Sequence, residues 1–224
     1  MELIEQVKVD IQQFLNHEND ELLFNERDFQ MHLALHLIKL RHYHDVDLEY
    51  YVPCGELKNY KWNSEMKLDI LVHKDNEYLP VELKYKTRRY SKQMTRFDEH
   101  LTKPIDVLKN QGAQDLGMYD FWKDVHRIEL VRNRFGAVSN GLAVFATNDP
   151  YYVREDYKVT SNHYNFRMTS DNTSRCRHWM YPKEQRKANY YDTYPDFDLE
   201  GSYAIHWSNT QFEGVPIYYC IVEI

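Results

Sequence analysis

Residues 68–86, LDILVHKDNEYLPVELKYK, contain two apolar runs separated by a short polar segment. The runs at 67–73 and 78–85 are rich in branched and aromatic side chains, which predicts two strands. The three residues between them, 74–76, favour a tight turn, so the strands are expected to pair as an antiparallel hairpin. The chain is therefore constrained to a fold that contains a β-sheet with this hairpin in it.

Three charged residues interrupt the apolar strands. Asp69 lies in the first strand, whereas Glu82 and Lys84 lie two positions apart in the second. Because side chains at i and i+2 of a strand point to the same face, Glu82 and Lys84 emerge together, and pairing brings Asp69 close to Glu82. Two carboxylates held together among apolar neighbours are costly unless a cation lies between them.

A divalent metal ion would resolve that conflict. Carboxylates, water and a backbone carbonyl such as that of Leu83 are hard oxygen ligands that suit Mg²⁺ or Mn²⁺. Such an ion polarises a phosphodiester and lowers the pKa of a bound water. Lys84 would orient or help to deprotonate the attacking water, or neutralise developing negative charge. The three charged residues therefore predict metal-dependent phosphodiester hydrolysis.

The remaining periodicity predicts helices that alternate with strands. Apolar residues at helical spacing predict helices at 1–16, at 25–42 with Asn25 as N-cap, and from Pro104 to about residue 130. Strands are expected at 46–53, and at 141–147 as a buried central strand. Residues 86–103 are polar and basic, which favours a loop or an irregular crossing.

The C-terminal third lacks a sustained period. Residues 151–200 are rich in Tyr, Asn, Arg and Asp, which predicts an elaborated loop region, and strands are expected at 202–208 and 216–223. With no internal repeat and no linker, residues 1–224 are expected to form one domain with a core at about 20–150. The fold class is α/β, a mixed central sheet flanked by helices, with extra C-terminal strands completing the sheet.

Asp69, followed after twelve residues by Glu82-Leu83-Lys84, resembles the core motif of the PD-(D/E)XK, or restriction-endonuclease-like, nuclease superfamily. The resemblance covers about residues 20–150 and implies an αβββαβ core, which matches the predicted order of elements. It differs in having Leu68 where the motif has proline. The implied activity is that of a Mg²⁺- or Mn²⁺-dependent DNA endonuclease of restriction- or repair-like type.

The same resemblance implies further site residues. A helix before the core often supplies another acid, and Glu26 occupies that place beside Asp69, Glu82 and the Leu83 carbonyl as a metal ligand. A glutamine from the helix after the core strands recurs in some branches, and either Gln111 or Gln114 fits that role. The alternative for Glu26 is a simple charge at a helix N-terminus, and Glu49 and Glu65 are alternative acids.

The net charge of −7 is unevenly distributed. Residues 1–50 hold 4 Lys and Arg against 11 Asp and Glu, whereas residues 84–109 hold 8 against 3. Phosphate contacts need local positive charge, so the basic run is expected to bind the DNA backbone, or RNA, through Lys86, Arg88, Arg89 and Lys92. A second basic group lies further on, at Arg175, Arg177, Lys183, Arg186 and Lys187.

Several alternatives remain at this level. Glu82 and Lys84 could form a surface salt bridge, and the fold could be a catalytically inactive nucleic-acid-binding or assembly protein. Cys54, Cys176 and Cys220 form no CxxC pair, which favours reduced thiols in a cytoplasmic protein over a zinc ribbon or disulfides. A signal peptide or membrane span is not expected. Many members of the superfamily act as dimers, so the resemblance also suggests a homodimer, although no dimer stripe is visible.

Overall fold

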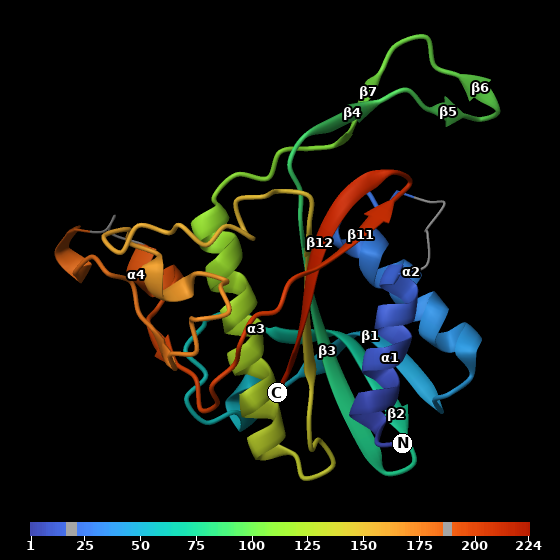
Figure 1. Ribbon diagram of the computed structural model, residues 1–224. Coiled ribbons are helices and arrows are strands. Elements are labelled where there is room, and N and C mark those ends of the chain that lie inside the picture. The colour runs from blue at the N-terminus through green and yellow to red at the C-terminus, as the bar shows by residue number, and fades with distance from the viewer. Residues whose placement is uncertain (17–21, 186–189) are drawn as a thin grey trace.

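The computed structural model describes residues 1–16, 22–185 and 190–224, and its centre is a six-stranded sheet (Figure 1). The strand order across the sheet is β1-β2-β3-β8-β12-β11. These strands are β1 (Asp45–Val52), β2 (Met66–Lys74), β3 (Glu77–Lys86), β8 (Leu142–Thr147), β11 (Ser208–Phe212) and β12 (Val215–Glu223). The predicted α/β class with a mixed central sheet is confirmed, and the C-terminal strands extend the sheet as expected.

The predicted hairpin is present. β2 pairs with β3 in antiparallel register from Lys74 opposite Glu77 to Ile70 opposite Val81, and β1 pairs antiparallel with the other edge of β2. β3 and β8 are parallel, which requires a crossover, and the long helix α3 (Gln114–Arg134) lies within it. Beyond β8 the pairing is antiparallel again, through β12 to β11.

Helices cover both faces of the sheet. Val144 and Ala146 of β8 pack in a core with α1 (Leu3–Asn16) and α2 (Glu26–Leu40), whereas the alternating residues Ala143 and Phe145 pack with α3. This alternation follows from the two-residue period of a strand. Figure 1 shows α1 and α2 on one side of the sheet and α3 on the other. Groups of β3 that lie directly under α3 are therefore covered by that helix.

The expected N-cap of the second helix is confirmed. The Asn25 side chain accepts a hydrogen bond from the backbone N–H of Asp28 at 3.0 Å, which satisfies one of the free donors of the first turn. The cap fixes where α2 begins, and so places Glu26 at its first position. No helix in the described residues is long and apolar enough to cross a membrane.

The prediction of a helix from Pro104 is wrong. Residues Ile105–Leu108 form strand β7, which pairs with β4 (Tyr90–Lys92), and α3 begins only at Gln114 after Ala113 in the left-handed region at φ 59°. The apolar rhythm that predicted the helix needed Gly112 to occupy one of its steps, and residues 109–113 belong instead to no helix or strand. Residues 87–110 form an arm that projects from the body in Figure 1 and carries a further strand pair, β5 (Thr95–Arg96) and β6 (Glu99–His100).

The C-terminal region is irregular between residues 151 and 207, which confirms the expectation for residues 151–200. It contains two short strands, β9 (Cys176–Arg177) and β10 (Phe197–Asp198), the short helix α4 (Tyr190–Thr193) and single turns at Tyr164–Phe166 and Lys183–Gln185. A similar turn, Cys54–Glu56, follows β1. The strand predicted at 202–208 is wrong. The strand begins at Ser208, because Tyr203, Ile205 and Trp207 instead pack in the aromatic cluster over α3.

Candidate active site

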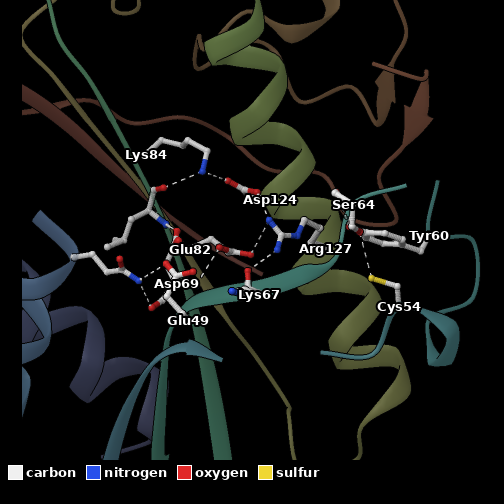
Figure 2. A network of polar contacts seen from close by, with 12 residues as sticks. Glu49, Cys54, Tyr60, Ser64, Lys67, Asp69, Glu82, Lys84, Asp124 and Arg127 are labelled. Atoms are coloured by element: carbon white, nitrogen blue, oxygen red, sulfur yellow. Dashed lines mark hydrogen bonds and ion pairs between the residues drawn. The ribbon is translucent and has the colours of Figure 1, made fainter. Parts of the chain in front are cut away.

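Asp69 and Glu82 lie where the hairpin strands separate (Figure 2). Past the Ile70–Val81 pair, side chains take over the contacts between β2 and β3. The backbone N–H of Leu83 donates to Asp69 Oδ2 at 2.7 Å, and the backbone N–H of Asp69 donates to Glu82 Oε2 at 3.4 Å. The two acids are therefore adjacent, as the sequence predicted, and each is held by the other strand's backbone.

Glu82 and Lys84 lie on the α3 side of the sheet. Between them in sequence, Leu83 packs with Val81 and Tyr85 in the core under α1 and α2. The expected division of β3 into a charged face and an apolar face is confirmed. The charged face is buried by α3 rather than solvated, since the Glu82 side chain is 2% exposed and that of Lys84 is 14% exposed.

Asp124 of α3 forms the tightest contact of Lys84. Lys84 Nζ lies 2.6 Å from Asp124 Oδ2 and donates to the Leu83 carbonyl at 3.0 Å. Glu26 Oε1 lies 3.8 Å from the same ammonium. Lys84 is thus enclosed by a carboxylate from each helical layer, and the Leu83 carbonyl, predicted to bind metal, accepts a hydrogen bond from its ammonium group.

Glu26 lies at the far end of β3. Its Oε2 accepts the backbone N–H of Tyr85 at 3.0 Å, so the first residue of α2 caps a free donor of the strand. The structure therefore brings Glu26 to Lys84, as expected from its place before the core. Its contacts are with Lys84 and Tyr85, and its role as a metal ligand remains a prediction.

Arg127 of α3 is the second cation of the cluster. Its Nη1 lies 3.0 Å from Asp124 Oδ1 and 3.4 Å from Glu82 Oε1, and its Nη2 donates to the Lys67 carbonyl at 2.5 Å. Asp124 and Arg127 are three residues apart, which places them on the same face of the helix. This guanidinium therefore links α3 to both strands of the hairpin.

Gln30 of α2 binds the other side of β2. Its Nε2 donates to the Asp69 carbonyl at 2.5 Å and to Glu49 Oε1 at 3.2 Å. Glu49, one of the alternative acids, lies on β1 with φ 52° beside Asp69, as Figure 2 shows. The other alternative, Glu65, is exposed before β2 begins. Glu49 is therefore the alternative acid that the fold brings to the cluster.

The electrostatics follow from burial and from crowded charges. Burial raises the pKa of Glu82 well above its usual value, against the attraction of Arg127, and Asp124 and Asp69 raise it further. Burial also raises the pKa of Asp69, although Lys84 opposes this. For Lys84, burial alone would lower the pKa, but the carboxylates of Asp124 and Glu26 raise it well above its usual value.

The pKa of Asp124 is shifted in the opposite direction to that of Glu82. Burial would raise the pKa of its carboxyl, yet the neighbouring Lys84 and Arg127 hold that pKa below its usual range. The two cations of the cluster thus stabilise the charge of Asp124 most. Burial makes the ionised forms of Asp69 and Glu82 unfavourable with only these two cations nearby, so a further cation would stabilise their negative charge.

The donor set suits Mg²⁺. Buried Glu82 Oε1 accepts no hydrogen bond from the described part of the chain, although Arg127 lies nearby. Acids outnumber cations in the cluster: the acids are Asp69, Glu82, Asp124 and Glu26, and the cations are Lys84 and Arg127. Mg²⁺ is commonly bound through one or two carboxylates with several waters, so Asp69 and Glu82 suffice as protein ligands.

Of the two candidate glutamines, Gln114 is the first residue of α3, whereas Gln111 lies before the helix begins, so the expected helical position is wrong for Gln111. The Gln111 backbone N–H donates to the Thr87 carbonyl at 2.8 Å, whereas the Gln114 side chain donates to Asp149 Oδ2 at 3.2 Å. Gln111 thus contacts the arm, and Gln114 contacts the loop after β8. Asp124, further along α3, is the residue that reaches Lys84.

The predicted DNA-binding residues follow directly from β3. Lys86 ends that strand, and Arg88 and Arg89 are exposed at the base of the arm. Asn148 fixes the backbone of Arg88 through hydrogen bonds to its N–H and carbonyl at 2.6 and 2.9 Å. Lys92 Nζ is paired with Glu213 Oε1 at 2.9 Å, which ties the arm to the β11–β12 turn.

The second basic group is only partly available to a ligand. Arg177 is fully buried, with its guanidinium 3.8 Å above the Trp122 ring, so it belongs to the aromatic cluster and does not contribute to a basic surface. Lys183 lies over the Tyr191 ring at 4.5 Å. Arg186 and Lys187 lie outside the described residues. Of this second basic group, Arg177 is therefore unavailable for contacts with a phosphate backbone.

Sequence reasoning missed Asp124, Arg127 and Gln30. A signal was present for the first two, because they are charged and three residues apart in a helix segment whose neighbours Trp122, Val125 and Ile128 are apolar. Charges inside such a segment indicate buried partners. Their partners could not be identified, since they lie 40 or more residues away on β3.

Fold and site together define a mixed α/β protein with a buried cluster of acids and cations between a hairpin and a crossover helix. Comparisons with protein-family models, with curated proteins and with solved structures find no match. The likeness to the PD-(D/E)XK superfamily therefore rests on this chain's own residues and on the order of its elements.

Proposed function

We propose that this protein is a metal-dependent nuclease of the PD-(D/E)XK type, which hydrolyses phosphodiester bonds in DNA as a restriction- or repair-like endonuclease. One observation carries the proposal: Asp69 and Glu82 are adjacent where β2 and β3 separate, with Lys84 on the same face. The order α2-β1-β2-β3-α3-β8 supports it, because it is the αβββαβ order that the superfamily resemblance implies.

Each residue of the cluster has a definable task in this chemistry. Asp69 and Glu82 would hold Mg²⁺, and Glu26 and Glu49 are the further acids that the sequence offers as ligands. When bound, the ion supplies the Lewis acidity that polarises the phosphodiester and stabilises the leaving oxygen. Lys84, held between Asp124 and Glu26, is an ammonium group that can orient the attacking water and neutralise charge developing on phosphorus.

Asp124 and Arg127 are positioning residues in this proposal. Asp124 fixes the direction of the Lys84 side chain, and Arg127 holds Glu82 and Asp124 in register with the strands. Neither has to touch the substrate. Their buried charges keep the reacting groups of β3 aligned, which matters because small displacements of catalytic groups cause large losses of rate.

The arm supports DNA as the substrate. Arg88 and Arg89 are exposed directly after the β3 segment that carries the site, so a phosphate backbone bound there would run close to Lys84. A hollow of about 780 Å³ lies between the arm and the start of α2, and its lining combines Lys92, Arg96 and His100 with the acids Asp28 and Glu213. Because Lys92 is paired with Glu213, the exposed Arg88, Arg89 and Arg96 are the basic groups of the arm that favour a polyanion.

A cleavage assay tests the proposal. The purified protein is incubated with supercoiled, linear and branched DNA, and with RNA, in Mg²⁺, Mn²⁺ or chelator. We expect metal-dependent cleavage of DNA that Asp69→Ala and Lys84→Ala abolish, and that the matched surface variant Lys58→Ala retains. Cleavage that survives either site substitution contradicts the site, and cleavage of RNA alone contradicts the substrate.

A second function is favoured by one specific observation. Lys84 and Arg127 already pair with Asp124 and Glu82, so the cluster could serve as a structural charge network in a DNA-binding protein without catalysis. Calorimetric titration with Mg²⁺ and with DNA separates the nuclease from the structural alternative. Mg²⁺ binding that disappears in Asp69→Asn favours the nuclease, whereas DNA binding without metal binding or cleavage favours the structural alternative.

A further inference from the structure

Two short strands outside the main sheet bring together a cysteine, a histidine and an aspartate. β9 and β10 pair antiparallel, with Cys176 directly opposite Asp198. His178 follows Cys176 by two residues, and its Nε2 lies 3.0 Å from Asp198 Oδ1. Among the described residues, these three form the one group of Cys, His, Asp or Glu whose ligand atoms all lie within 4.8 Å of one another.

The alternating residues of the same strands fix this arrangement. Arg177 and Phe197 are paired opposite each other, and both are completely buried. Arg177 stacks on Trp122 of α3, and Phe197 packs against Tyr119 and Trp62 at ring distances of 5.5 Å. Because side chains alternate along a strand, anchoring these two residues inward turns the cysteine, histidine and aspartate outward on one face.

Hydrogen bonds from backbone N–H groups hold the two strands in register at both ends. The Leu199 N–H donates to the Arg175 carbonyl at 2.9 Å, and the Trp179 N–H donates to Asp196 Oδ1 at 2.8 Å. The pairing itself is only two residues long on each strand, which is marginal for an isolated ladder. A metal ion that bridged the outer face would therefore cross-link two strands whose own ladder is short.

The geometry points to a Zn²⁺ site formed by Cys176, His178 and Asp198, with solvent as the fourth ligand. Thiolate, imidazole and carboxylate are the three protein ligand types that Zn²⁺ prefers. Tetrahedral coordination needs ligand atoms about 3.3–3.8 Å apart, as follows from Zn–N and Zn–S bonds of about 2.0 and 2.3 Å. Small side-chain rotations bring the present group to that spacing.

Solvent reaches the group from one side. The side chains of His178 and Asp198 are 45% and 63% exposed, so a metal ion can enter and keep an open position. The sulfur distinguishes this site from the carboxylate cluster at Asp69 and Glu82, which offers only oxygen ligands and suits Mg²⁺. The Zn²⁺ site is therefore independent of the proposed nuclease activity.

Titration with Co²⁺ tests the site, because thiolate-bound Co²⁺ gives a charge-transfer absorption in the near ultraviolet that carboxylates do not. We expect the metal-free protein to develop this band at one equivalent of Co²⁺ and to lose it when Zn²⁺ is added. Cys176→Ser should lack the band, and His178→Gln and Asp198→Asn should weaken Co²⁺ affinity at least tenfold.

Two controls keep the result specific. Cys54→Ser removes a partly buried free cysteine elsewhere, and Asp69→Asn alters the proposed Mg²⁺ site, so both variants should keep the band. Zn²⁺ should raise the melting temperature of the wild type but not of Cys176→Ser, with circular dichroism confirming that each variant is folded. Absence of the band in the folded wild type, or its persistence in Cys176→Ser, contradicts the site.

Discussion

The buried cluster and the projecting arm contain the same kinds of charged side chain in opposite surroundings. In the cluster, Glu82 and Asp124 are 2% and 3% exposed and share the cation Arg127. On the arm, the ion pair of Arg89 and Asp106 is 68% and 41% exposed. Buried charges depend on every partner, because the protein has replaced their water, whereas solvent screens exposed charges.

This difference separates stability from binding in the two regions. In the cluster, removing one charge leaves another buried without compensation, so folding and chemistry are affected together. On the arm, a lost charge is replaced by water, so the fold tolerates the change while contacts with a polyanion weaken. Substitutions of buried and of exposed charges should therefore differ in their effects on stability and on binding.

Arg127→Ala should cause the largest loss of stability. The substitution leaves Glu82 and Asp124 facing each other without their shared cation, which we expect to cost about 3–5 kcal/mol in the free energy of unfolding. Urea denaturation measures this loss in the free energy of unfolding. Arg89→Ala on the arm is the matched control, and its effect should be far smaller. Equal effects in the two variants would contradict the contrast between buried and exposed charge.

Asp69→Asn should nearly abolish cleavage while leaving the protein folded. The amide keeps the shape of the side chain but removes the negative charge that attracts the metal, so we expect a loss of at least about 100-fold in cleavage rate. Single-turnover cleavage in Mg²⁺ measures it, with circular dichroism as the check on folding. A rate within a few-fold of the wild type would remove Asp69 from the site.

Glu82 should make the stability depend on pH. The pKa of Glu82 in the folded protein is raised above the ordinary value of 4.5, so protonation of this carboxyl favours the folded state. The stability gained in this way is fully present below pH 4.5 and is lost as the pH rises through the raised pKa. Over that window the wild type should lose at most about 1.4 kcal/mol per pH unit through this group. Glu82→Gln should show a flatter profile by urea denaturation at several pH values, and an unchanged slope would contradict the assignment.

The smallest effect on folding is expected from the double variant Arg88→Ala/Arg89→Ala. Both side chains are exposed, so stability should change little, but DNA binding should weaken by about 1 kcal/mol, or roughly fivefold, for each lost phosphate contact. Fluorescence anisotropy at several salt concentrations should also show a shallower salt dependence. Lys58→Ala, an exposed charge away from the arm, should retain wild-type affinity and slope.

Much of the fold could be predicted because local signals agree with tertiary contacts. The apolar runs of β2, β3 and β8, the turn after Lys74 and the Asn25 cap are each specified by neighbouring residues. The arm could not be predicted in the same way. Residues Ile105–Leu108 have an apolar pattern compatible with helix or strand, and pairing with β4 decided between them.

The residues of the candidate site also differ in whether the sequence could predict their positions. Asp69, Glu82 and Lys84 are close in sequence, and the two-residue period of β3 is sufficient to place Glu82 and Lys84 on one face. Asp124 and Arg127 belong to another element, and nothing in their own segment indicates which strand they approach. Cys176 and Asp198 are a further example, since the spacing of the cysteines alone argued against a metal site there.

The sequence by itself determined the hairpin, its charged face and the helix that carries Glu26, because these features depend on periods of two and 3.6 residues and on a local cap. Only the tertiary structure decided that α3 buries that charged face and supplies Asp124 and Arg127 to it. The physical reason is that a buried charge must find its partner wherever the packed chain provides one, and packing joins segments that are distant in sequence.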